Sequence, residues 1–344
     1  MTERHRAVPF PLLAGVLLAL TAAVALFSLA IGRFPVPVER VARILLSVLF
    51  PTEASWTPQE TSVVLLIRLP RVLGSLLAGG GLALAGAALQ GVFRNPLVGP
   101  QIIGVSSGAG FGGAVAILFF DGLFAVIPLA FVFGLLAMVA VWSLGSGERE
   151  ESLLSLVLGG VVISAFFTAL TSLGQYVADP YNKLPAIVMW LMGSFASSSW
   201  ERLLFAAPVI CCAGTLLHLI RFRINVLSLG QEEAESLGMN VHRNRWLVLA
   251  CTTLITAATV ALAGIVGWVG LVVPHMARML VGSDHRKLLP VSALLGASYL
   301  ILMDDIARSL TAAEIPIGIL TALAGAPLFA FLLKKRQRKG GAWM

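Results

Sequence analysis

The residues best placed to do chemistry are the serines of GVSSGAGFGG, which spans residues 104–113. By letter, GVSSG matches the GxSxG pattern that holds a nucleophilic serine on a sharp turn between a strand and a helix. No predicted strand precedes it, and the phosphate-binding pattern GxxxxGK(S/T) is absent from the whole chain. We therefore interpret the run as a place where helices lie close together, because glycine lets backbones approach.

The histidine, cysteine and acidic side chains do not show the spacing of a catalytic or metal-binding site. No span carries an HExxH or DxxxD pattern, and the chain has no CxxC pair. The histidines show no paired ligand spacing and the cysteines fall in apolar runs: His5, His218, His242, His275, His285, Cys211, Cys212 and Cys251. The sequence therefore predicts no catalytic residue, no metal site and no cofactor bound by this chain itself.

Composition places the chain in a membrane. Of its 344 residues, 58% are hydrophobic and 12% are charged, which is well outside the range of soluble domains. A helix needs about 20 residues to cross the hydrocarbon core of a bilayer, so the chain has room for about ten crossings. We predict an all-α integral membrane protein, surrounded by lipid and organised as one transmembrane domain over residues 1–344. The net charge of +7 is explained by basic residues at helix ends, and we expect no nucleic-acid partner.

The distribution of basic residues predicts the orientation. A basic start, MTERHR, precedes the first span at residues 10–31, and a basic tail at residues 334–344 follows the last span. Sixteen of the 24 Lys and Arg residues fall at the predicted inner ends, as the positive-inside rule requires. We therefore predict a multi-pass protein with both termini in the cytoplasm.

The longest polar stretch in the second half of the chain is residues 225–246, NVLSLGQEEAESLGMNVHRNRW. It predicts a short helix that is capped by Ser228, carries glutamates in its first turn and ends at Gly238. Asn240 is expected to cap the helix that follows. A helix of two turns is not stable alone in water. The stretch is therefore either an ordinary solvated loop or a docking element for a cytosolic partner.

Hydroxyl and amide side chains interrupt the fifth predicted span. Polar groups within a span face protein or water more often than lipid, because lipid leaves them unsatisfied. They can instead bond back to the carbonyls of their own helix. Two roles therefore remain possible for the polar residues of this span: they line a transport pathway, or they bond to their own helix. These residues are Ser164, Thr168, Thr171 and Gln175.

The motifs between Arg68 and Lys335 resemble those of the FecCD-type permeases of type II ABC importers. They occur in the family's order as RLPR, FRNPLVGP, GVSSGAG, WLMGS, GLVVPH, DHR and EIPIGILTALAGAP. The resemblance implies a ten-span permease in a bacterial or archaeal cytoplasmic membrane, working as a dimer with an identical second chain. It also implies two cytosolic ABC ATPase subunits, which use ATP and Mg²⁺, and a substrate-binding protein. The family imports ferric siderophores, haem and vitamin B12, and the run QYVADPYNKLPAIVMWLMGSF favours a ferric siderophore over haem or cobalamin.

The resemblance also implies roles for individual residues. The coupling residues, which would seat in the ATPase, are Gly230, Glu233, Ala234, Leu237 and Gly238. The cytoplasmic gate would contain Asn95, Leu97 and Ser152. The acidic lobes of the binding protein would dock on three outer arginines that depart from the positive-inside trend: Arg68, Arg71 and Arg308.

An ion-coupled secondary transporter is the main alternative to an ATP-driven importer. Such transporters carry ionisable residues deep within their spans. Spans two to six of this chain contain almost no charge at mid-depth. An intramembrane enzyme would need a nucleophile motif or paired carboxylates facing a cavity. GVSSG matches such a motif by letter but lacks the preceding strand, and no span carries a DxxxD pattern.

Overall fold

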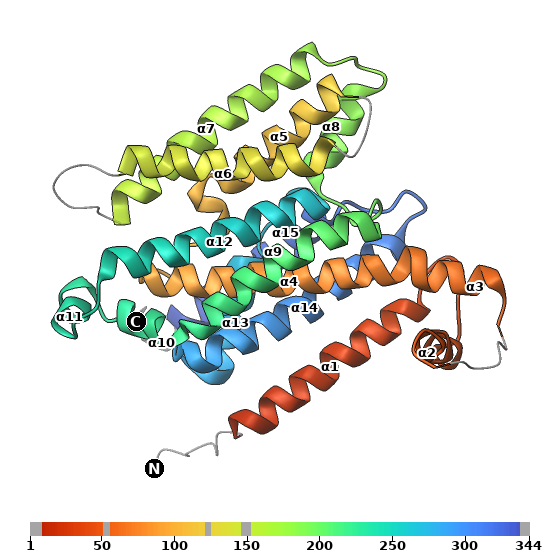
Figure 1. Cartoon of the computed structure of the whole chain (residues 1–344), viewed down its shortest axis with the longest axis horizontal. Coiled ribbons are helices and arrows are strands. Elements are labelled where there is room, and N and C mark those ends of the chain that lie inside the picture. Colours follow the sequence, from red (N-terminus) through yellow and green to blue (C-terminus); the bar gives the residue numbers. More distant parts are fainter. Residues whose placement is uncertain (1–8, 51–55, 121–124, 146–152, 338–344) are drawn as a thin grey trace.

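The computed structural model of the chain describes residues 9–50, 56–120, 125–145 and 153–337, and every regular element in these ranges is helical (Figure 1). The long helices are α1 (Phe10–Ala30), α4 (Leu69–Val92), α6 (Val126–Gly145), α7 (Leu153–Val177), α9 (Trp200–Leu219), α12 (Val241–Ala263), α14 (His285–Leu310) and α15 (Ile317–Gln337). The shorter elements are α2 (Val38–Ser47), α3 (Pro58–Ser62), the π-helix η1 (Val63–Arg68), the 3₁₀-helix η2 (Pro100–Ile103), α5 (Val105–Phe119), α8 (Lys183–Met192), α10 (Arg221–Leu227), α11 (Gln231–Ser236) and α13 (Val269–Val281).

Seven helical stretches of the described chain are long and apolar enough to cross a membrane. They are α1, the continuous run from α3 to α4, α6, α7, α9, α12 and α14. The described chain also contains the shorter apolar helices α5, α8, α13 and α15. The all-α membrane fold is therefore confirmed, and α8 is too short to cross, as expected from its length.

Helices α4 and α12 form the centre of the bundle. In their most apolar stretches 83% and 78% of the residues are buried, against 22% for α1 and α7. Small residues allow this packing: a Cβ on Gly86 would collide with the carbonyl oxygen of Gly270, and one on Gly79 with that of Gly296. Glycine at these positions lets α13 and α14 lie directly against α4.

The bundle has two distinct ends (Figure 1). Helices α10 and α11 lie at one end, which we call the α11 end, and α2 and α3 lie at the other, which we call the α3 end. Helices α5, α6 and α7 form a group on one side of α12, and α1 runs along the opposite side. The predicted gate residue Ser152, the first eight residues and residues 338–344 of the basic tail lie outside the described ranges.

Candidate functional site

Helix α11 is short, but both of its ends are well defined. Gly230 precedes it with φ 141°, and Gly238 follows it with φ 76°. The Gly238 amide donates to the Glu235 carbonyl over 2.9 Å, and the Met239 amide donates to the Ala234 carbonyl over 3.0 Å. These two bonds form a Schellman motif, which satisfies the last carbonyls of the helix. The predicted stop at Gly238 is confirmed.

The predicted cap at Ser228 is wrong. Ser228 follows the last residue of α10, and its hydroxyl donates to the Asn225 carbonyl over 2.6 Å. The prediction failed because the chain does not leave α9 as a loop but continues as α10, so that Gly230 stands before α11 instead. The predicted cap of the next helix is confirmed, since Asn240 accepts a bond from the Arg243 amide over 2.8 Å.

One buried residue supports α11. Ala234 is fully buried in the same core cluster as Ile224 of α10 and Val241 of α12. The other five residues of α11 are exposed, and the Leu237 side chain that follows them is 65% exposed. An apolar side chain on the tip of a braced, otherwise acidic helix is suited to contact a partner protein.

A network of hydrogen bonds connects α10 to the start of α14. The Asn225 amide group donates to Asp284 over 2.7 Å, and its oxygen accepts from the His285 backbone amide, also over 2.7 Å. Asp284 also pairs with Arg286 at 2.9 Å. The hydrogen bonds from Arg286 and then Asn225 hold the pKa of the Asp284 carboxyl below its usual range. The support of α11 is thus continuous with α14, which packs on α4.

The predicted gate residues Asn95 and Leu97 lie at the α11 end. The Asn95 side chain accepts a bond from the Leu97 amide over 2.9 Å, which closes a tight turn around Pro96. Leu97 is 43% exposed. Asn95 also lines a cavity of about 160 Å³ together with Ser228 and Arg278, so this turn borders α10 and α13. A role in gating stays a prediction.

The three arginines predicted to dock a binding protein do lie at the α3 end, but they are buried. Arg68, Arg71 and Arg308 are 4%, 7% and 6% exposed. These three residues therefore do not form an exposed patch on the chain, and a role in docking the binding protein stays a prediction. Arg71 is paired with Asp304 and Glu314, and Arg308 is paired with Asp305.

The contacts of Arg68 explain why this arginine is buried. Its guanidinium group donates to the backbone carbonyls of Leu29, Ala30 and Phe34, at the end of α1 and just beyond it. A buried charge is tolerated only where its donors are satisfied. Arg68 thus ties α1 to the α3–α4 run instead of facing outward.

Two of the three hydroxyl groups predicted for a pathway in α7 bond back to their own helix. Thr168 donates to the Ser164 carbonyl over 2.7 Å, and Thr171 donates to the Phe167 carbonyl over 2.8 Å. Thr168 is exposed and Thr171 is buried, while Ser164 and Gln175 are half-buried. A pathway role for these four residues stays a prediction.

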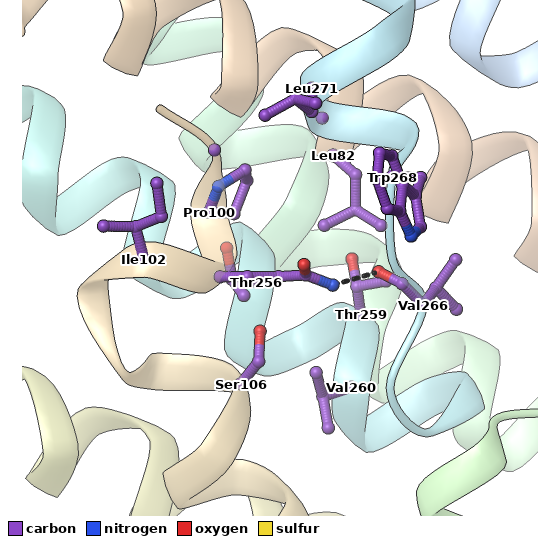
Figure 2. Close-up of a pocket in the computed structure, with 13 residues that line it drawn as sticks. Leu82, Pro100, Ile102, Ser106, Thr256, Thr259, Val260, Val266, Trp268 and Leu271 are labelled. Atoms are coloured by element: carbon purple, nitrogen blue, oxygen red, sulfur yellow. Dashed lines mark hydrogen bonds between the residues drawn. The ribbon is translucent and has the colours of Figure 1, made fainter. Parts of the chain in front are cut away.

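A cavity of about 120 Å³ lies at mid-depth between η2, α12 and the segment that joins α12 to α13 (Figure 2). Figure 2 shows Ser106, Thr256 and Thr259 on one side of it, and Trp268 and Leu271 on the other. Gln101 also lines the cavity and donates to the Val266 carbonyl over 3.5 Å. The sequence analysis missed this site, although the repeat of Thr252, Thr256 and Thr259 on one face of α12 was a usable signal.

A second, larger cavity of about 450 Å³ opens at the α3 end. Lys183 and Arg202 line it with Ser194 and Ser197, and no acidic residue is among its described lining residues. Arg202 is only 6% exposed and donates to the Ser197 hydroxyl over 2.9 Å. Two cationic side chains among the lining residues make this cavity attractive to anions. In the described ranges, no three His, Cys, Asp or Glu side chains gather as metal ligands would.

The chain is similar to known transport proteins along most of its length. The molybdate import system permease protein MolB of Haemophilus influenzae is 49% identical over 319 residues, which cover 92% of this chain and 93% of that protein. The cobalamin import system permease protein BtuC of Halobacterium salinarum is 41% identical over 281 residues, 81% of this chain and 75% of that protein. A solved structure of a metal-chelate type ABC transporter in an inward-facing conformation matches with a TM-score of 0.85 and 44% identity, over 94% of this chain and 99% of that one. Residues 19–335 match the FecCD transport family, and the chain therefore belongs to this family of ABC transporter permeases.

Proposed function

We propose that this chain forms the membrane pathway of an ATP-driven importer as one of two identical permease subunits. Two cytosolic ATPase subunits bind at the α11 end, and a substrate-binding protein delivers cargo at the α3 end. Family membership supports an ABC importer over an ion-coupled secondary transporter, and it agrees with a transport role for this chain in place of an enzymatic one.

The observation that carries this proposal is the construction of α11. Its Schellman motif and the burial of Ala234 fix the helix on the bundle, while its remaining side chains are exposed. A rigid, exposed helix that is braced through α10 onto α14 can transmit a movement of the ATPase to the membrane helices. The predicted coupling residues fit this role, with Glu233 and Leu237 exposed and Gly230 and Gly238 shaping the two ends.

For the cargo, we favour a tetrahedral oxyanion of the molybdate type. This is supported by a relative described as a molybdate permease, which is 49% identical along nearly the whole chain. The cavity lined by Lys183 and Arg202 at the α3 end supports an anionic cargo in general, because it would concentrate anions at the entrance.

A metal chelate is the second candidate, and the sequence analysis favours a ferric siderophore within this class. It is supported by the 44% identical structure described as a metal-chelate type transporter. Because the relatives include permeases for molybdate and for cobalamin, membership of the family does not separate the two cargo classes.

The test is uptake by the complete importer in liposomes that contain ATP. The permease, its ATPase and its binding protein would be reconstituted, and accumulation of molybdate, a ferric siderophore and cobalamin would be measured in parallel. We expect ATP-dependent accumulation of molybdate alone. Accumulation of a chelate but not of molybdate would show that the cargo is a metal chelate. Accumulation without ATP would contradict the proposal that the protein belongs to an ATP-driven importer.

A further inference from the structure

We propose that the mid-depth cavity of Figure 2 is a binding site for a tetrahedral oxyanion inside the membrane domain. The inference deepens the proposed function, since such an ion would be the cargo. It rests on the hydrogen-bonding groups of the cavity, on the helices that begin beside it and on one buried hydroxyl that has no partner.

The side chains of the cavity offer hydrogen-bond donors. Ser106 and Thr259 present hydroxyl groups, Gln101 presents an amide group, and Trp268 presents an indole N–H. None of the described lining residues is charged, so the cavity holds neither a carboxylate that would repel an anion nor a cation that would trap it. Neutral donors of this kind bind an oxyanion by hydrogen bonds alone.

Thr259 provides the clearest sign of a missing ligand. Its side chain is 0% exposed to solvent, and its hydroxyl has no hydrogen-bond partner among the residues that the structure describes. A buried hydroxyl without a partner is unfavourable, so such groups usually meet a ligand or an ordered water. Thr256 differs, because its hydroxyl donates to the Thr252 carbonyl over 2.7 Å.

Two helices begin at the cavity. Helix α5 starts at Val105, next to lining residue Ser106, and α13 starts at Val269, next to lining residues Gly270 and Leu271. Both helices exceed eight residues, so each has the positive end of its dipole at its first turn. Half-helices whose N-termini meet near the middle of the membrane are a known way to hold an anion in a transporter.

The size of the cavity agrees with this ligand. Its volume of about 120 Å³ corresponds to roughly eight water-sized spheres of ~15 Å³ each. An ion with four oxygens therefore fits, with room for some water. The absence of a cation among the described lining residues predicts weak binding, which suits a site that must release its ion.

The test is equilibrium dialysis of sodium molybdate against the full-length permease in phosphatidylcholine nanodiscs, with metal quantified by mass spectrometry. Sodium tungstate and sulfate serve as competitors, and chloride serves as the control anion. We expect saturable molybdate binding that tungstate displaces and chloride does not. Absence of saturable binding by the unmodified chain would mean that the cavity holds only water, and would overturn the proposal.

The variant Thr259→Val removes the unpartnered hydroxyl, and Thr253→Val is its matched control. Thr253 lies on the same helix, is 3% exposed and also has an unpartnered hydroxyl, but it does not line the cavity. We expect Thr259→Val to weaken molybdate binding by about tenfold, and Thr253→Val to change it by less than about twofold. Neither change should lower thermal stability, because each removes an unsatisfied polar group. Equal binding by the two variants would overturn the proposal.

Trp268→Phe and Ser106→Ala extend the test to the other side of the cavity. Each removes one donor and keeps most of the side-chain volume, so each should weaken binding by several-fold. The binding and uptake experiments together distinguish a failure of the proposed site from a failure of the proposed function. Molybdate uptake with unchanged binding in Thr259→Val refutes only the site. Tungstate-competed binding that depends on Thr259, in an importer that does not accumulate molybdate, refutes only the cargo.

Discussion

Arg71 and Asp304 form a bidentate ion pair inside the bundle, with an Nε–Oδ2 distance of 2.8 Å and an Nη2–Oδ1 distance of 2.9 Å. Their side chains are 9% and 2% exposed. Glu314, in the segment before α15, adds a second carboxylate at 3.0 Å from Arg71 Nη2. One guanidinium group therefore holds α4, α14 and the approach to α15 together at the α3 end.

Replacing Arg71 should reveal how much this pair supports the fold. Arg71→Met leaves Asp304 buried without its partner, and breaking a buried pair in this way costs about 3–5 kcal/mol. The control is Arg40→Gln, because the Arg40 side chain is 48% exposed and its pair with Glu60 is therefore screened by solvent and should be worth less than the buried pair. Thermal unfolding in detergent should show a large loss for the first variant alone. Similar midpoints for both variants would contradict the assignment.

Arg68→Glu separates a structural role from a docking role. Because Arg68 is buried and satisfies three carbonyls, the variant should lose stability to a similar degree at low and high salt. Stability would be measured by thermal unfolding, and docking by titrating the binding protein against the permease–ATPase complex in nanodiscs at two salt concentrations. A stable variant whose docking is weakened only at low salt would support the interpretation of Arg68 as a docking residue.

The fold was predictable to the extent that it depends on local composition. The lengths of the apolar runs predicted an all-α membrane fold and a short α8, and Gly238 and Asn240 correctly marked helix ends. The burial of the arginines was not predictable in this way. Arg71 meets Asp304 across 233 positions of the chain, and only the packing of α14 on α4 brings them together.

The site was less predictable than the fold. The α7 hydroxyls were singled out as polar groups in a span, yet Thr168 and Thr171 are satisfied by their own helix. The α12 hydroxyls belong to an equally apolar run, in which Thr252 and Thr256 bond back to their own helix, whereas Thr253 and Thr259 have no partner among the described residues. Tertiary packing determines which hydroxyl remains without a hydrogen-bond partner. The spacing of residues in the sequence therefore does not predict it.

Asp284 should make the α11 end sensitive to acid. Its carboxyl has a lowered pKa in the folded protein, so it contributes stability above the usual pKa of an Asp, about 3.9. This contribution is lost progressively as the pH falls from that value towards the lower pKa of the folded state. Asp284→Asn should therefore show a shallower loss of stability between about pH 5 and pH 3 than the unmodified chain. Thermal midpoints measured across this range provide the check. Parallel curves for the two proteins would mean that the bonds to Arg286 and Asn225 do not stabilise the fold.

The last prediction concerns the end of α11. Gly238 has φ 76° and open space around it, so a side chain there is opposed only by the backbone conformation. Gly238→Val should cost on the order of 1–2 kcal/mol and loosen the Schellman motif. Gly282→Val is the matched control, because Gly282 has φ 78° and the same open surroundings but ends α13.

Both valine variants should lose similar stability, but only Gly238→Val should uncouple the ATPase. In the reconstituted importer, we expect it to lower the ATPase activity stimulated by binding protein by about fivefold or more, in line with a local cost of at least 1 kcal/mol. Gly238→Asn should retain more activity than Gly238→Val, because asparagine tolerates this backbone conformation better than a β-branched residue. Equal ATPase stimulation in the Gly238→Val and Gly282→Val complexes would show that α11 is not the coupling element.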